Sequence, residues 1–133
     1  MPSRTDLAVA LLLASISTVN AEQVVCHYTY GGETQVLAAQ PAKSPYAEKG
    51  IKVGSYFQFR LVFQNEPANM AAIKIYTYVD RDEGPTLIHQ ANFPYLPQRH
   101  VANPYGFTGL HFVYEPVRDS ELQYWCEMKS TNE

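Results

Sequence analysis

The chain has 133 residues, a formal net charge of −3 and 17% charged residues. A protein that binds nucleic acid usually carries a strongly basic surface, and ten Lys and Arg residues against thirteen Asp and Glu residues do not supply one. Length and composition therefore favour a single small globular domain and argue against a nucleic-acid partner.

Residues 1–21 have the features of a secretory signal peptide. Arg4 precedes a short apolar core, LAVALLLASI, and Ala21 ends a run of small residues that suits signal peptidase. The core is too short to anchor the chain in a bilayer, and no later apolar run is long enough to span one. Sequons for N-glycosylation are absent, which favours a bacterial periplasm. We therefore expect an exported protein, periplasmic or extracellular, whose residues 22–133 form one domain.

The first predicted strand and the last one each carry a cysteine. Cys26 and Cys126 are the chain's two cysteines, and in an oxidising compartment they are expected to form a disulfide. Closing a loop of that length stabilises the fold by about 4–5 kcal/mol on the chain-entropy model. The bridge would clasp the N- and C-terminal strands together and favours one domain over two.

In chain order, two-residue alternation of apolar and polar residues predicts seven strands, at residues 23–30, 34–38, 56–63, 73–79, 86–91, 110–114 and 121–128. The clearest alternation is YFQFRLVF, which is expected to bury every second residue from Phe57 to Phe63. The next strand, IKIYTYV, is expected to bury its isoleucines and to turn Tyr76 and Tyr78 outward. In the connection before residue 54, Ile51 and Val53 are expected to dock on a sheet edge.

Seven strands with turn residues between them predict an antiparallel β-sandwich. The stretch GIKVGSYFQFRLVF resembles the opening strands of bacterial immunoglobulin-like modules. The stretch DSELQYWC is similar to the end of immunoglobulin strand F, with Tyr124 two residues before Cys126. The resemblance implies an immunoglobulin-like sandwich of about seven strands. Because the cysteines are too far apart and too little chain follows Cys126 for another full strand, it indicates an architecture and no particular family.

A long, proline-rich and almost uncharged segment, ANFPYLPQRHVANPYGFTGLHF, joins two of the predicted strands. Its prolines stiffen the backbone, and long loops in small domains are often functional. Aromatic side chains on a stiff loop and on an outer strand face suit recognition of a partner. The candidate partner-binding residues are Phe93, Tyr95, Tyr105, Phe107, Tyr76 and Tyr78. The alternative is that the segment is a structural strap over the core.

Catalytic and metal-binding motifs are hard to find in this sequence. Gly-x-Ser-x-Gly, His-Glu-x-x-His, phosphate-loop and dinucleotide motifs are all missing, so we expect neither enzymatic activity nor a cofactor. His89, His100 and His111 could converge on a zinc or copper ion, but their spacing is not that of a metal motif, and a structural role is favoured. The acidic stretch at residues 80–84 is interpreted as a turn.

These observations predict a non-catalytic, exported binding module that recognises a protein partner, such as an accessory or assembly subunit of the cell envelope or an inhibitor. One alternative is a small-ligand or carbohydrate-binding module that uses surface tyrosines. A further alternative is a metal-handling protein that uses His89, His100 and His111.

Overall fold

The computed structural model describes residues 22–97 and 104–130, which form strands and one short 3₁₀ helix. In chain order these are β1 (Glu22–Tyr30), β2 (Glu33–Ala39), β3 (Ile51–Val53), β4 (Phe57–Gln64), η1 (Ala68–Met70), β5 (Ala72–Arg81), β6 (Gly84–Pro94), β7 (His111–Glu115) and β8 (Ser120–Ser130).

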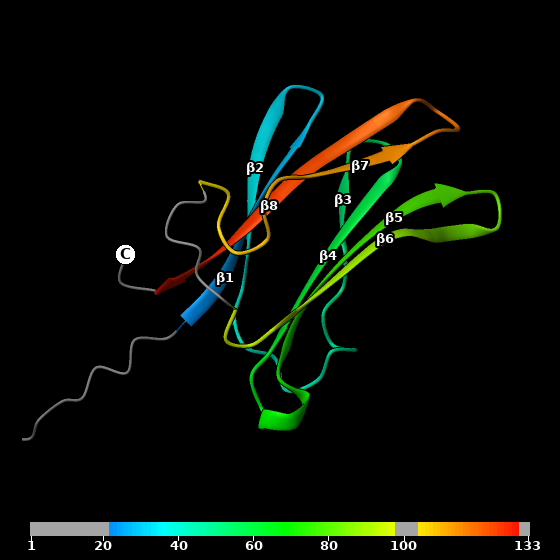
Figure 1. The fold of residues 1–133 in the computed structure, drawn as a ribbon. Helices are drawn as coiled ribbons and strands as arrows, with labels where there is room; N and C mark the ends of the chain where they lie inside the picture. Colours follow the sequence, from blue (N-terminus) through cyan, green and yellow to red (C-terminus); the bar gives the residue numbers. More distant parts are fainter. Residues whose placement is uncertain (1–21, 98–103, 131–133) are drawn as a thin grey trace, which may run out of the picture.

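The strands form two four-stranded sheets. Sheet A has the order β2-β1-β8-β7, and sheet B has the order β3-β4-β5-β6. All neighbouring strands are antiparallel. Sheet B is a simple meander, whereas sheet A is built from the first and last hairpins of the chain. Figure 1 shows the blue, cyan, orange and red strands of sheet A facing the green strands of sheet B.

The predicted all-β fold with two antiparallel sheets is confirmed, and each of the seven predicted strands is present within a few residues of its expected ends. The eighth strand, β3, was not predicted as a strand. Its Ile51 and Val53 pair with β4 at the edge of sheet B, as expected for residues docked on a sheet edge. The strand predicted at residues 86–91 is longer than expected, since β6 continues to Pro94 and includes the first residues of the proline-rich segment.

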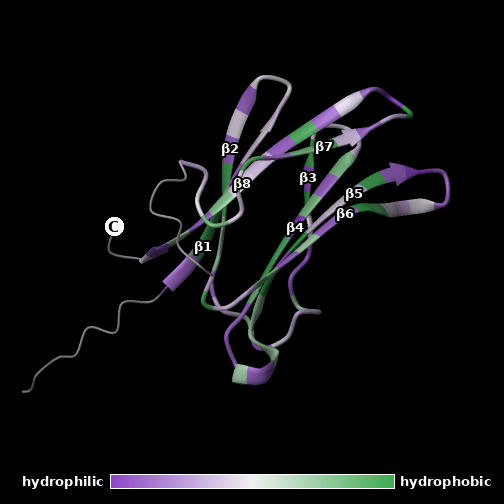
Figure 2. Cartoon of the chain, viewed as in Figure 1, coloured by the Kyte–Doolittle hydropathy of each residue, from purple (hydrophilic) through white to green (hydrophobic). Residues whose placement is uncertain are grey.

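Side chains that alternate inward from both sheets form one hydrophobic core. In β4 the predicted inward residues are fully buried, and in β5 Ile73 and Ile75 are buried while Tyr76 and Tyr78 face outward. Figure 2 shows the hydrophobic residues along the central strands β1, β4 and β8, with a hydrophilic β5–β6 turn. The two-residue period of a strand therefore accounts for the core.

The predicted disulfide joins Cys26 of β1 to Cys126 of β8. The two cysteines are directly opposite each other in the register of these neighbouring strands, and both are fully buried. The bridge therefore fastens the N-terminal strand to the C-terminal strand within one sheet.

Among the described residues, no helix is long and apolar enough to cross a membrane. The predicted signal peptide at residues 1–21 and the predicted candidate His100 lie outside the described residues.

Candidate functional site

Three of the predicted partner-binding aromatics pack against the core. The rings of Phe93 and Phe107 meet edge to face with centroids 5.4 Å apart, and the ring of Tyr95 lies 5.2 Å from that of Phe63. The Tyr95 hydroxyl also donates a hydrogen bond to the Glu22 carboxylate, and that bond raises the pKa of Tyr95. All three aromatics are partly buried. These contacts favour the strap interpretation for this part of the segment.

The end of the proline-rich segment is fastened to β8 beside the disulfide. The backbone N–H of Phe107 donates to the Cys126 carbonyl at 3.0 Å, and the N–H of Cys126 donates to the Thr108 hydroxyl at 2.8 Å. Gly106 forms an isolated bridge with Cys126. Residues 106–108 thus occupy the place beside β8 that β7 would fill if it were longer.

Tyr105, another predicted binding residue, leads from this fastened segment onto the outer face of sheet A. Its ring meets that of Trp125 edge to face, with centroids 6.1 Å apart. Trp125 stands opposite His27 of β1 in the strand register, and Phe112 of β7 stands opposite Gln123 of β8. Trp125 and Phe112 therefore lie on one face of sheet A, because alternate residues of a strand share a face, and Tyr105 contacts that face at Trp125.

We call this surface the aromatic face. It consists of Val36, Tyr105, Phe112, Tyr114 and Trp125. Val36 and Phe112 are each 58% exposed, Tyr114 is 54% exposed and Tyr105 is 40% exposed. Large apolar side chains exposed together on one sheet face are unusual in a small soluble domain and commonly mark an interaction surface.

Polar side chains lie among the residues of the aromatic face and hold two of its rings in place. The imidazole of His27 lies parallel to the indole of Trp125 at 4.0 Å, and its Nε2 is 2.7 Å from a carboxylate oxygen of Glu127. At the other end, the Tyr114 hydroxyl donates to Asp119 at 2.6 Å, and this bond raises the pKa of Tyr114. Apolar and polar side chains together are usual in a protein interface.

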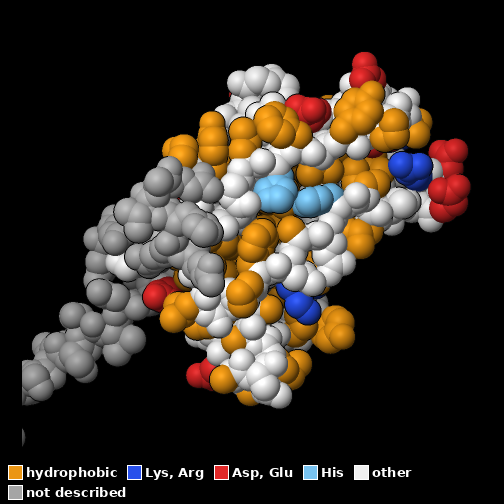
Figure 3. Space-filling view, viewed as in Figure 1, with side chains coloured by type: hydrophobic (Ala, Val, Ile, Leu, Met, Phe, Trp, Pro, Cys, Tyr) orange, Lys and Arg blue, Asp and Glu red, His pale blue; other side chains and the backbone are white. Residues whose placement is uncertain are grey.

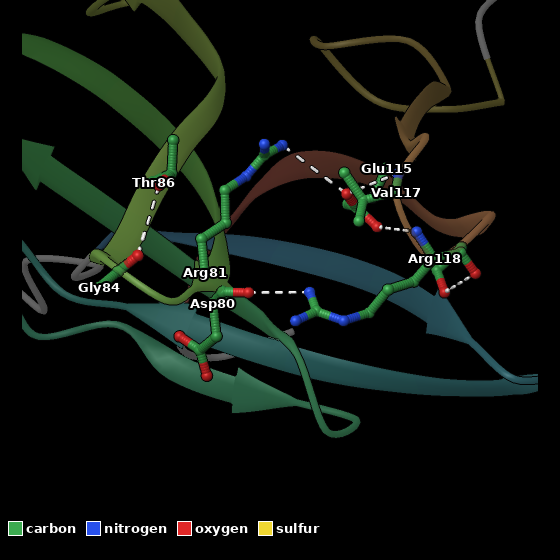
Figure 4. Close-up of polar contacts among 8 residues, drawn as sticks. Asp80, Arg81, Gly84, Thr86, Glu115, Val117 and Arg118 are labelled. Atoms are coloured by element: carbon green, nitrogen blue, oxygen red, sulfur yellow. Dashed lines mark hydrogen bonds and ion pairs between the residues drawn. The ribbon is translucent and has the colours of Figure 1, made fainter.

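The strand that carries Phe112 and Tyr114 ends at a buried carboxylate (Figure 4). Glu115 accepts hydrogen bonds from the backbone N–H groups of Val117 and Arg118 at 3.0 and 2.7 Å, and Arg81 of sheet B lies 3.7 Å from it. Arg118 donates to the backbone carbonyl of Asp80 at 2.8 Å. These contacts fasten the β7–β8 turn to sheet B and fix the position of β7.

Tyr76 and Tyr78 lie on the opposite side of the sandwich, on the outer face of sheet B. Their rings are nearly parallel with centroids 6.3 Å apart, and the Arg60 guanidinium lies 4.9 Å above the Tyr76 ring. The six predicted binding residues therefore do not form one surface. They separate into the strap, the aromatic face and this tyrosine pair.

His89 and His111, two of the three histidines considered as possible metal ligands, lie close together. Their ring centroids are 5.6 Å apart, and Figure 3 shows two histidine side chains side by side at the surface between the sheets. Burial lowers the pKa of His89, and the charge on His111 lowers it further. Within residues 22–97 and 104–130, no group of three potential metal ligands comes together.

Both rings of this histidine pair contact Tyr124 of β8. His89 Nε2 lies 2.6 Å from the Tyr124 hydroxyl, and the His111 ring is stacked on the Tyr124 ring with centroids 5.0 Å apart. Burial raises the pKa of the Tyr124 hydroxyl, which therefore stays protonated. The cluster can exchange or hold a proton, and its imidazoles can bind a metal ion.

Sequence reasoning missed Val36, Phe112, Tyr114 and Trp125 as surface residues. The stretch HFVYE of β7 carried a signal. One face of this strand holds Val113 between His111 and Glu115, and the other face holds Phe112 and Tyr114. Neither face of that strand is clearly the polar one, so the alternation does not show which side is outside.

No protein-family model, curated protein or solved structure matches the chain.

Proposed function

We propose that the protein is a non-catalytic binding module that works outside the cytoplasm and recognises a protein partner through the aromatic face of sheet A. The observation that carries the proposal is the exposure of Phe112 and Tyr114 on the face of sheet A that also carries Trp125. Aromatic side chains supply large contact areas with little loss of conformational entropy. An accessory or assembly subunit of the cell envelope, or an inhibitor, would use such a face.

The disulfide supports the proposed location, because buried disulfides persist in oxidising compartments such as the periplasm. The name immunoglobulin-like is likewise a proposal about architecture. It is supported by the two antiparallel layers, but the disulfide here joins neighbouring strands of one sheet, whereas in antibody domains it joins the two sheets.

The proposal is tested by cross-linking the mature protein in its native host and identifying captured proteins by mass spectrometry. Wild type is compared with Phe112→Lys and with Leu87→Lys as the matched control, since Leu87 is 44% exposed on the outer face of sheet B. We expect one discrete partner, captured by wild type and by the control and lost with Phe112→Lys. Capture that Phe112→Lys leaves unchanged would remove the aromatic face from the proposal.

A second candidate function, carbohydrate binding, is favoured by the parallel rings of Tyr76 and Tyr78. Two adjacent aromatic faces on a sheet can stack on sugar rings. The test is a glycan-binding screen with wild type and with Tyr76→Ala and Tyr78→Ala. Binding that both variants lose would favour this function over the protein partner.

A further inference from the structure

We infer that His89 and His111 form a binding site for a divalent transition-metal ion, with Cu²⁺ bound more tightly than Zn²⁺, at the gap between edge strands β6 and β7. This site is separate from the aromatic face, and the inference does not rest on the proposed partner. It uses two histidines, from different sheets, that the packing of the two sheets brings together.

The separation of the two rings suits one shared ion. A zinc ion binds an imidazole nitrogen at about 2.0–2.1 Å, and the ring centroid lies roughly 1 Å beyond that nitrogen, so two imidazoles on one ion have centroids roughly 5–6 Å apart. The centroids of His89 and His111 are 5.6 Å apart, with their planes inclined by 51°. The rings therefore already lie at the spacing that shared coordination requires.

Both rings make their hydrogen bonds through Nε2, so Nδ1 is the nitrogen of each ring that would bind a metal. A carbonyl oxygen only accepts, so His111 Nε2, which lies 2.9 Å from the Thr108 carbonyl, carries the proton, and Nδ1 of the neutral ring holds the lone pair. His89 Nε2 bonds to the Tyr124 hydroxyl, and when Nε2 donates, Nδ1 again holds the lone pair. A metal-binding imidazole commonly donates its other N–H to such a partner.

The site is open to solvent and bordered by a further polar group. Figure 3 shows two histidine side chains reaching the surface of this side of the molecule. Thr77, which stands opposite His89 in the β5–β6 register, is fully buried, and its hydroxyl has no hydrogen-bond partner among the described residues. Exchangeable ligands such as water would complete the coordination of an ion held by two side chains.

The donor atoms select the class of ion. Two neutral imidazoles suit copper, nickel and zinc, whereas Mg²⁺ and Ca²⁺ prefer oxygen ligands. The Irving–Williams order places Cu²⁺ above Zn²⁺ for the same nitrogen site. Because His89 belongs to sheet B and His111 to sheet A, an ion bound to both would link the two sheets and stabilise the folded state.

The experiment measures the thermal unfolding of the mature protein at neutral pH, without metal and with an excess of Cu²⁺, Zn²⁺ or Mg²⁺. The variants are His89→Gln and His111→Gln. The matched control is His27→Gln, because His27 pairs with Glu127 on the outer face of sheet A. We expect Cu²⁺ to raise the melting temperature of wild type and control, Zn²⁺ to raise it less, and Mg²⁺ to leave it unchanged. Either histidine variant should lose most of the shift.

A second measurement covers the case in which a variant unfolds at ambient temperature. In the NMR spectrum of the wild-type protein, substoichiometric Cu²⁺ should broaden the ring signals of His89 and His111 before those of His27. A Cu²⁺ shift that His89→Gln and His111→Gln retain in full, broadening confined to His27, or the absence of both effects in wild type would overturn the inference.

Discussion

His89 Nε2 lies 2.6 Å from the hydroxyl oxygen of Tyr124, in a hydrogen bond that joins β6 of sheet B to β8 of sheet A. Burial lowers the pKa of His89 from its ordinary value of 6.5, and the neighbouring His111 lowers it further. The folded state therefore binds a proton at His89 less readily than the unfolded state does. This difference makes the stability of the fold depend on pH.

The free energy of unfolding should fall as the pH drops below about 6.5, because the unfolded state then binds more protons than the folded state. The contribution of His89 stops changing once the pH is below its folded-state pKa. Urea unfolding over a pH series, in the presence of a chelator, measures the effect. The variant His89→Gln should flatten this dependence, whereas His27→Gln should not. An unchanged pH dependence in His89→Gln would show that other groups cause it.

The carboxylate of Glu115 should be important for stability, since it is 1% exposed and accepts two backbone hydrogen bonds on different oxygen atoms. In Glu115→Gln one oxygen becomes an NH₂ group that faces an N–H donor, and the interaction with Arg81 loses its charge. We expect a loss of about 2–3 kcal/mol in the free energy of unfolding.

The matched control for this prediction is Glu121→Gln, because Glu121 is an exposed carboxylate on the neighbouring strand β8. Its replacement should change the free energy of unfolding by less than about 0.5 kcal/mol. Urea unfolding of both variants measures the difference, and equal effects would mean that the buried hydrogen bonds of Glu115 contribute little.

The strands, the core and the disulfide could be predicted from the sequence because each depends on a local pattern. The alternation in β4 and β5 identifies buried residues directly, and the two cysteines of the chain can form a disulfide within it only with each other. β3 was missed as a strand because three residues are too few to show a period. Its apolar residues still indicated where it docks.

The candidate sites could be predicted only in part, because they depend on which strands become neighbours. Trp125 stacks on His27 because β1 pairs with β8, although the two residues lie far apart in the sequence. The meeting of His89 and His111 requires the two sheets to face each other. The sequence shows that the proline-rich segment is stiff, but only the packing of Phe93 places it against the core.

The strap interpretation predicts that Phe107→Ala destabilises the fold. Phe107 packs edge to face on Phe93 and against the core, so its removal should cost about 2 kcal/mol, less than a fully buried phenylalanine. The control is Phe112→Ala, which removes the same side chain from a position that is 58% exposed and should cost well under about 1 kcal/mol. Chemical unfolding of the two variants measures this contrast. If Phe112→Ala were the more destabilising change, the strap would not contribute to the stability of the core.

Gly106 should tolerate a side chain poorly. Its φ is +62°, and a Cβ atom there would lie 2.1 Å from the Cys126 carbonyl oxygen, which accepts the Phe107 hydrogen bond. Gly31 is a matched control, because its φ is +61° and a Cβ atom at that position would meet nothing within 4 Å. Gly31→Ala should cost roughly 1–2 kcal/mol from the left-handed backbone alone.

Gly106→Ala should cost more than Gly31→Ala, because the backbone beside β8 must move and weaken the hydrogen bond between Phe107 and Cys126. Chemical unfolding measures the difference in stability, and amide hydrogen exchange at Phe107 reports on the bond itself. Faster exchange at Phe107 in Gly106→Ala, with unchanged exchange in Gly31→Ala, is the expected result. Equal losses of stability with full protection of Phe107 would show that residues 106–108 are not fastened to β8 in solution.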